Sequence, residues 1–256
     1  MDYLAMNQKA WDQRTTLHFE SNFYDVNTFI RGKSSLNPIE LEEVGDVAGK
    51  SLLHLQCHFG QDSLSWARKG AKVTGVDLST KAIEKARYLA EEMGIDAEFI
   101  NADVCQFGRE NSKLFDIVFT SYGVLGWLPD LKLWATTISN SLKSGGQFNL
   151  IEFHPMIDLL SGYSYFAHQA PDIEEGGTYT ENGVDHKSMT AQWSHPISEV
   201  ITALREVGIS IDSFHEHPYS PYCCFEDLIE VKGEGYQMLH KGKNVPLLYS
   251  IKGYKK

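Results

Sequence analysis

Short apolar runs alternate with helical patterns of hydrophobic positions from about residue 49 to residue 153. The first run, Ser51–Cys57 (SLLHLQC), follows Gly49 and leads into a loop, as expected for a buried parallel strand. The run FDIVFTS consists largely of β-branched and aromatic residues, which favour strands. Four runs after the first predict strands, and FDIVFTS is the third of them. They lie at Ala71–Asp77, Ala97–Ala102, Phe115–Ser121 and Gln147–Phe153.

Helical patterns lie between these runs. Gln61–Lys69 can form a helix that ends at Gly70, because glycine readily adopts the left-handed conformation at a helix C-terminus. Ser79 can cap a second helix, in which apolar residues follow the 3.6-residue period as far as Gly94. A third helix carries Leu131, Trp134, Ala135, Ile138 and Leu142 on one face. Regular strand–helix alternation predicts a parallel sheet with helices on both faces.

Outside this region the pattern is less regular. Residues 1–48 contain an amphipathic stretch from Trp11 to Phe23, and we interpret them as an N-terminal lid. Residues 155–195 mix aromatic and polar positions, and we expect an insertion that caps a pocket, with antiparallel structure at Thr178–Trp193. Regularity then returns with one helix and two strands, at Ser198–Val207, Ile209–Phe214 and Pro246–Ile251. We therefore expect a single domain over residues 49–256.

The composition of the 256 residues limits the partners of the chain. Hydrophobic residues make up 42%, enough for a sizeable core, which excludes general disorder. Asp and Glu together number 34 against 23 Lys and Arg, a net charge of −11. Because this charge repels a phosphate backbone and no local basic patch offsets it, we expect no nucleic-acid partner. No apolar stretch reaches about 18 residues, so we expect no membrane-spanning helix and no membrane partner.

Cysteine spacing and the N-terminus point to a location. The four cysteines, at positions 57, 105, 223 and 224, fit neither a zinc site nor a redox CxxC pair. The N-terminus lacks the basic and apolar regions of a secretory signal. We therefore expect reduced thiols in a cytoplasmic protein. Nothing in the sequence fixes the oligomeric state.

Polar side chains follow the ends of the first three predicted strands. The first strand leads into the turn Gln56–Gly60, which can present backbone N–H groups to a ligand at a helix N-terminus. Asp77 ends the second strand and can accept hydrogen bonds from both hydroxyls of a ribose. Asp103 lies just past the third strand and can accept one from an adenine amino group. Each aspartate alone is also explained as a helix N-cap, but in this order they predict a nucleoside site.

These motifs resemble those of the class I S-adenosylmethionine-dependent methyltransferases, over roughly residues 45–155. The family's first motif is a strand ending in D-x-G-C-G-x-G, and the aligned stretch here is His54–Gly60 (HLQCHFG), a variant that keeps Cys57 and the last glycine. The acidic end of the second strand matches as GVDLS and the third motif as ADV. The fourth motif matches as FDIV, and LKSGG matches the L-K-P-G-G turn before the fifth strand.

The resemblance implies a Rossmann-like, doubly wound α/β fold with a seven-stranded, mostly parallel sheet whose last strand is antiparallel. It also implies S-adenosylmethionine as the cofactor. Because Gln56 and His58 replace glycines of the motif, we expect their side chains to contact the cofactor. The cofactor-binding residues predicted in this way are Gln56, Cys57, His58, Gly60, Asp62, Asp77, Leu78, Ala102, Asp103, Val104 and Ser121.

The reaction implied is in-line transfer of a methyl group to an O or N atom of a small molecule. A base is needed only if the acceptor must lose a proton. The candidates are Tyr122, Glu152 and His154, with His154 preferred as the base because its ordinary pKa is near 6.5. A histidine hydrogen-bonded beside Pro155 explains His154 equally well. Arg31 is a candidate partner for the carboxylate of the cofactor.

Two alternatives stay open. One is an NAD-dependent oxidoreductase, although only Gly60 of a G-x-G-x-x-G loop is present. The other is a non-catalytic module that binds S-adenosylmethionine. The sequence His215-Glu216-His217 resembles a metal site, but a third ligand at the usual spacing is missing, so we expect no metal.

Overall fold

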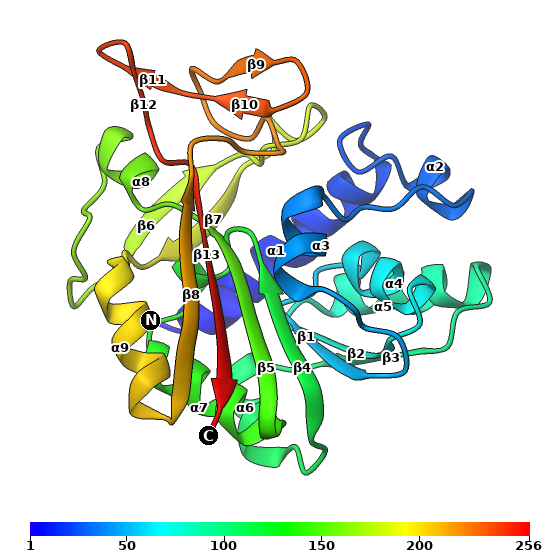
Figure 1. Cartoon of the computed structure of the whole chain (residues 1–256). Coiled ribbons are helices and arrows are strands. Elements are labelled where there is room, and N and C mark those ends of the chain that lie inside the picture. The colour runs from blue at the N-terminus through cyan, green and yellow to red at the C-terminus, as the bar shows by residue number, and fades with distance from the viewer.

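A computed structural model describes residues 1–256 of the chain, and its centre is a seven-stranded sheet (Figure 1). The strands follow the order β3-β2-β1-β4-β5-β13-β8. Their bounds are Ser51–Leu55 (β1), Lys72–Asp77 (β2), Ala97–Asn101 (β3), Phe115–Ser121 (β4), Leu142–Phe153 (β5), Ile209–His217 (β8) and Leu248–Lys255 (β13). The last strand, β13, is antiparallel to both of its neighbours, and the other six run in one direction. The expected mostly parallel sheet with an antiparallel last strand is confirmed.

Helices cover both faces of this sheet, as predicted. Helices α3, α4 and α5 pack on one face, and α6, α7 and α9 pack on the other. The helices are Tyr3–Glu20 (α1), Val26–Ile30 (α2), Pro38–Val44 (α3), Gln61–Arg68 (α4), Thr80–Glu92 (α5), Val104–Glu110 (α6), Leu131–Ser141 (α7), Met156–Leu160 (α8) and Ile197–Glu206 (α9). No helix has the length and apolar character needed to cross a membrane.

Strand β1 shows why the sheet needs two apolar layers. Successive strand residues point to opposite faces, and this strand has no polar alternation. Leu53 and Leu55 belong to the cluster on the α7 face together with Trp134. Leu52 belongs to the cluster on the α4 face together with Trp66. All five side chains are fully buried, so packing on both faces of the sheet fixes the position of β1 and of the turn that follows it.

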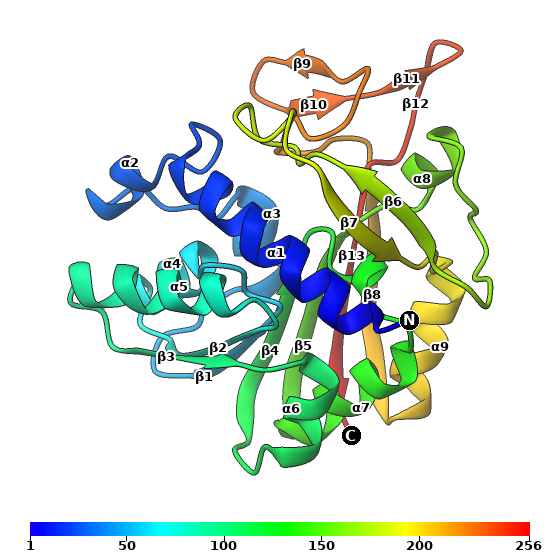
Figure 2. The ribbon, with the colours of Figure 1, turned by 180° about the vertical axis from the view of Figure 1, so that it is seen from behind.

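The N-terminal helix and the segment 155–195 lie together beyond the carboxyl ends of the parallel strands (Figure 2). The segment contains α8 and an antiparallel hairpin of β6 (Asp172–Gly176) and β7 (Ser188–Gln192). This hairpin starts earlier than the predicted Thr178–Trp193, because the residues from Gly177 to Lys187 form its long connection. Asn7 joins α1 to β7 through two hydrogen bonds with the backbone of Ala191, of 2.8 and 2.9 Å.

Two further hairpins follow β8 and were not predicted from the sequence. They pair β9 with β10 and β11 with β12, which span Ile229–Val231, Gly235–Gln237, Leu239–His240 and Lys243–Asn244. Residues 219–226, between β8 and these hairpins, reach back over the strand ends and supply lining residues to the cavity described next.

Candidate active site

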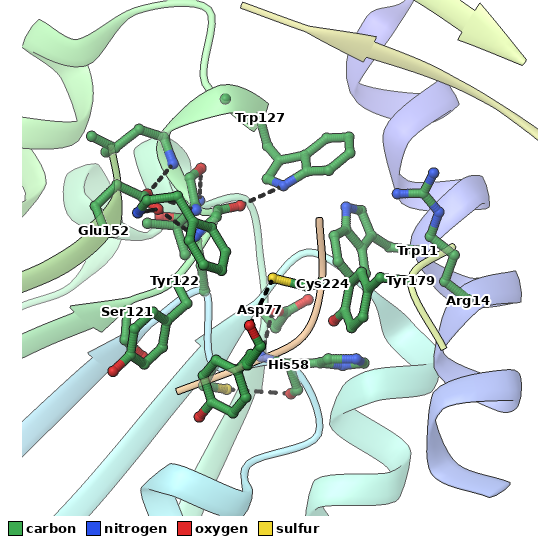
Figure 3. A pocket seen from close by; sticks show the side chains of 18 of the residues that line it. Trp11, Arg14, His58, Asp77, Ser121, Tyr122, Trp127, Glu152, Tyr179 and Cys224 are labelled. Atoms are coloured by element: carbon green, nitrogen blue, oxygen red, sulfur yellow. Dashed lines mark hydrogen bonds between the residues drawn. The ribbon is translucent and has the colours of Figure 1, made fainter. Parts of the chain in front are cut away.

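A cavity of about 1020 Å³ opens at the carboxyl ends of β1, β2, β3 and β4 (Figure 3). Its walls also include side chains of α1, of the segment 155–195 and of the loop 219–226. All eleven residues predicted to bind a cofactor line this cavity, as do Tyr122 and Glu152. Ligands of open parallel sheets bind at this edge, so the cavity is the candidate site. Whether each lining residue contacts a cofactor stays a prediction.

The turn after β1 keeps the backbone of a glycine loop although two of its glycines are replaced. Gln56 and His58 have φ angles of 56° and 50°, in the left-handed region that glycine favours. The Nε2 of Gln56 donates to the carbonyl oxygen of Val124 at 2.8 Å. Its Oε1 is buried without a hydrogen-bond partner. Gln56 therefore offers a free acceptor at the position where a bound molecule can donate.

Asp77 connects this turn to the end of β2. Its Oδ2 accepts the backbone N–H of His58 and its Oδ1 that of Ser79, both at 2.8 Å. Burial raises the pKa of Asp77 to about 6, and these two hydrogen bonds oppose the rise. Each oxygen retains a lone pair that can accept a ribose hydroxyl.

Asp103 is the N-cap of α6, as its position after the third strand permits. Its Oδ1 accepts the backbone N–H of Gln106 at 2.8 Å, at the N-terminus of α6. The same side chain lines the cavity beside Ala102, Val104 and Leu78. Capping occupies one carboxylate oxygen, so the other is free for an adenine amino group.

Asp62 and Ser121 lie at the far side of the turn. Asp62 stands in the first turn of α4. Burial raises the pKa of its carboxyl, and the nearby hydroxyls of Ser35 and Ser121 oppose that rise. Cys57 is 4% exposed, and burial raises the pKa of its thiol well above the usual range. This thiol stays protonated and uncharged at neutral pH.

The carboxylate of Glu152 is surrounded by backbone donors. Its oxygens accept the N–H groups of Gly123, Val124 (2.8 Å), Leu125 (3.0 Å) and Phe153 (2.7 Å). Burial raises the pKa of Glu152, and these hydrogen bonds act against the rise by stabilising the charged form. The geometry is that of a group that holds the loop after β4.

Tyr122 begins this loop, with a φ angle of 51°. Its hydroxyl oxygen is buried without a hydrogen-bond partner. Burial and the nearby carboxyl of Glu40 raise the pKa of Tyr122 well above the usual range. The phenol therefore keeps its proton at neutral pH and can donate a hydrogen bond.

The preferred base, His154, is not among the residues that line the cavity. Its Nδ1 accepts the N–H of Met156 at 3.1 Å, and its Nε2 lies 2.9 Å from the carboxylate of Glu216. Burial lowers the pKa of His154, and Glu216 opposes this. Because both ring nitrogens have partners, the geometry matches the alternative of a hydrogen-bonded histidine beside Pro155.

The other tempting motifs also have structural partners. His215 pairs with Glu43, with 2.9 Å between Nδ1 and Oε1. The structure contains no group of three or more His, Cys, Asp or Glu side chains placed to hold a metal ion. Arg31 does not line the cavity, and its Nη2 donates to the hydroxyl of Thr28 at 3.0 Å.

Several lining residues were missed by the reasoning from sequence. They come from segments without a recognisable motif and include Trp11, Arg14, Asp158, Tyr179 and Tyr222. The helical spacing of Trp11 and Arg14 places both on one side of α1, which was the only signal available. Asp158 is exposed, and its carboxylate forms no hydrogen bond with another residue.

The fold and the site together define a class of protein. A parallel α/β sheet with acidic residues at the ends of β2 and β3 forms a nucleoside site. The antiparallel strand β13, inserted between β5 and β8, distinguishes this sheet from the all-parallel order 3-2-1-4-5-6 of dinucleotide-binding dehydrogenases. The single glycine of the first turn, Gly60, also does not favour the NAD-dependent alternative.

Comparison with known proteins agrees with this class. Residues 52–146 match the family model described as a methyltransferase domain. A ubiquinone biosynthesis O-methyltransferase of Saccharophagus degradans is 25% identical over 208 residues, or 78% of this chain and 82% of that protein. The protein of the same name from Aromatoleum aromaticum is 31% identical over 147 residues, or 56% of this chain and 62% of that protein. Matches to such proteins from Salmonella arizonae and Klebsiella pneumoniae span about half of their length, 54%.

Solved structures show the same fold. An S-adenosylmethionine-dependent methyltransferase from Mesorhizobium loti has a TM-score of 0.56 and 20% identity, covering 88% of this chain and all of that one (100%). Another from Clostridium acetobutylicum has a TM-score of 0.60 and 14% identity, covering 98% and 99%. The chain therefore contains a methyltransferase domain and has the fold of the class I S-adenosylmethionine-dependent methyltransferases, whose cofactor is S-adenosylmethionine. The free Oε1 of Gln56 and the two aspartates at the strand ends fit this cofactor.

Proposed function

We propose that this methyltransferase acts on an oxygen atom of a small molecule that binds in the cavity beside the cofactor. The observation that carries the proposal is the size of the cavity. Its volume of about 1020 Å³ reaches the upper end of the roughly 300–1,000 Å³ of ligand pockets, which leaves space for a second small molecule. Transfer to oxygen, in preference to nitrogen, is supported by the names of the relatives.

Positioning accounts for most of the expected catalysis. S-adenosylmethionine supplies an electrophilic methyl group on its sulfonium. Asp77 holds the ribose and Asp103 the adenine, while Oε1 of Gln56 accepts a hydrogen bond from the amino-acid part of the cofactor. The rings of Trp11 and Trp127 lie in edge contact, with centroids 5.2 Å apart, and line the cavity with apolar surface that would exclude water around a bound ligand. A fixed, dry arrangement of this kind favours in-line displacement.

The candidate catalytic side chains take different roles in this proposal. Glu152 holds the loop after β4, and Tyr122 donates a hydrogen bond from its protonated phenol. Asp158 fits the role of proton acceptor better than His154 does. It lines the cavity with an exposed carboxylate that has no hydrogen-bond partner within the protein, whereas both ring nitrogens of His154 have partners.

We also propose that residues 1–48 act as a lid and that residues 155–195 cap the acceptor compartment of the domain at 49–256. Contacts between the two segments support this arrangement. The Nε2 of His18 lies 2.6 Å from the hydroxyl of Thr178. The hydroxyls of Tyr24 and Tyr179 lie 2.5 Å apart. Helix α1 and the cap therefore close the cavity as one unit.

Titration with S-adenosylhomocysteine tests the proposed cofactor contacts. Asp77→Asn should weaken binding by roughly tenfold to a hundredfold, since a charged hydrogen-bond partner is worth about 1.5–3 kcal/mol. Asp103→Asn keeps a good N-cap for α6 but loses the second acceptor, so any loss of affinity there comes from the cofactor.

Asp130→Asn is the matched control, because Asp130 caps α7 and lies outside the cavity. It should bind S-adenosylhomocysteine like the wild type. Wild-type affinity in Asp77→Asn would show that the cofactor does not bind as described. Mass spectrometry of reaction mixtures with candidate hydroxylated molecules then identifies the methylated atom, and exclusive methylation of nitrogen would contradict O-methylation.

A further inference from the structure

Arg14 is a buried cation in the wall of the cavity. Its side chain projects from α1 and lies beside two tryptophans (Figure 3). The central guanidinium carbon lies 5.5 Å from the ring centroid of Trp11 and 5.5 Å from that of Trp127. The residue is only 8% exposed. An arginine in such a position remains charged, so the charge needs a partner.

No carboxylate of the protein supplies that partner. Arg14 forms no salt bridge, and its one hydrogen bond runs from Nη2 to the carbonyl oxygen of Gly177 at 3.1 Å. The Nε atom is buried with no acceptor. Guanidinium has five N–H donors, so most of its hydrogen-bonding capacity is unused. A buried charge without a counter-ion is unfavourable, and a bound anion would relieve this cost.

Apart from Lys33, the rest of the cavity wall is acidic or neutral. The lining carboxylates include Asp62, Asp77, Asp103, Asp158, Glu174 and Glu226. Lys33 is the other lining residue with a permanent positive charge, and it pairs with Asp25 at 3.7 Å. An anionic group on a ligand is therefore attracted to the position beside Arg14 and repelled elsewhere, which fixes the orientation of the ligand.

The two sides of α1 show which ligand Arg14 faces. Gln8, Asp12 and Thr15 form one side, and they contact Leu78, Ser79 and Lys81 next to the nucleoside site. Asn7, Arg14 and His18 form the other side, and they contact Ala191, Gly177 and Thr178 of the segment 155–195, while His18 also contacts His58 of the turn after β1. Because the guanidinium of Arg14 donates to Gly177, it lies against the segment 155–195 and not against Leu78, Ser79 or Lys81.

We propose that Arg14 binds a carboxylate of the methyl acceptor, and that the acceptor is therefore an aromatic or otherwise apolar acid. The planar guanidinium matches a carboxylate with two parallel hydrogen bonds. The rings of Trp11 and Trp127 provide a surface for the apolar body of the acceptor. This inference rests on the proposed function, because it assigns the acceptor compartment of the same cavity.

Calorimetric titration of the complex with S-adenosylhomocysteine tests the inference. The probes are benzoate and its neutral analogue benzamide, added to the wild type, Arg14→Met and Arg14→Lys. Wild-type protein should bind benzoate at least about tenfold more tightly than benzamide, Arg14→Lys should keep part of this preference, and Arg14→Met should lose it. Arg31→Met is the matched control, because Arg31 is exposed and lies outside the cavity, and it should keep the full preference.

The cofactor itself also has a carboxylate, and a second titration separates the two sources. Affinity for S-adenosylhomocysteine should change less than about threefold in Arg14→Met. A loss of tenfold or more, with unchanged affinity for 5′-methylthioadenosine, would assign Arg14 to the cofactor and overturn the inference. Equal binding of benzoate and benzamide by the wild type would also overturn it. If the wild type bound no S-adenosylhomocysteine, the proposed function itself would fail, a result distinct from both.

Discussion

Replacing Glu152 by glutamine tests whether this residue is structural or catalytic. The carboxylate is 4% exposed and accepts four backbone N–H groups, two on each oxygen. Glutamine has the same shape but keeps only one acceptor oxygen. Its NH₂ group would face two N–H donors, either those of Val124 and Leu125 or those of Gly123 and Phe153. Two hydrogen bonds would be lost, and two buried donors would have no acceptor.

The size of the effect follows from the number of lost partners. A buried donor left without an acceptor costs about 1–3 kcal/mol, so two cost roughly 4 kcal/mol. In a chain of about this length, 1 kcal/mol corresponds to roughly 2–4 °C in the unfolding temperature. Glu152→Gln should therefore unfold roughly 8–16 °C below the wild type. Affinity for S-adenosylhomocysteine should also fall, because Val124 contacts Gln56 of the cofactor loop.

Thermal unfolding followed by circular dichroism at neutral pH measures this change. Glu226→Gln provides the matched control, since Glu226 lines the same cavity but is exposed and forms no hydrogen bond. It should unfold within about 1 °C of the wild type, as most surface substitutions do. The reasoning is refuted if Glu152→Gln unfolds at the wild-type temperature while methyl transfer falls a hundredfold or more. That result would make Glu152 the catalytic proton acceptor.

Two further predictions concern pH. Affinity for S-adenosylhomocysteine should fall as the pH drops through about 6, because burial raises the pKa of Asp77 to about 6 and the protonated carboxyl is a poorer acceptor. Titrations should show no such fall in Asp77→Asn, and a pH-independent wild type would contradict the assignment. Burial also raises the pKa of Glu40 to about 7. The unfolded chain loses this proton at lower pH, so folding stability should decrease by on the order of 3 kcal/mol as the pH rises from about 4.5 to about 7. Urea unfolding should show a flatter dependence in Glu40→Gln, and parallel curves for both proteins would exclude this role.

The sheet was predictable because its information is local. The run Phe115–Ser121 has the same bounds in sequence and structure, since apolar residues continue to both ends of the strand. Helix α6 was not predicted, because the contact that explains its glycine involves a distant part of the chain. Its Gly108 packs against Thr137 of α7, where an added Cβ atom would lie 2.0 Å from the threonine hydroxyl. A glycine that would normally weaken a helix is required here by tertiary packing, which no local pattern reveals.

The candidate site divides in the same way. The residues at the ends of β1 to β4 were predictable because parallel strands present their carboxyl ends at one edge. The residues of α1 and the cap were not, because they meet across long separations in sequence. Arg14 and Gly177 are 163 positions apart, and Asn7 and Ala191 are 184 positions apart. The partner of His154 was not predictable for a related reason, since its ring is bound by Glu216 on β8, a strand separated from β5 by β13.

In the variant first motif, Gln56 and His58 replace two glycines, yet the turn after β1 keeps the backbone conformation of the glycine loop. A left-handed conformation at Gln56 and at His58 costs roughly 1–2 kcal/mol each, which the surrounding contacts must offset. Gln56 bonds to the carbonyl oxygen of Val124, whose N–H is held by Glu152. The Nε2 of His58 lies 2.8 Å from Nδ1 of His18 on α1.

These two side chains therefore connect the turn after β1 to two different parts of the structure. Through Gln56 the loop is joined to β4 and β5, and through His58 it is joined to the N-terminal helix. A glycine at either position would satisfy the backbone but remove the connection. The turn after β1 and the helix that carries Arg14 are consequently joined by a direct contact, so the shape of the candidate site depends on the position of α1.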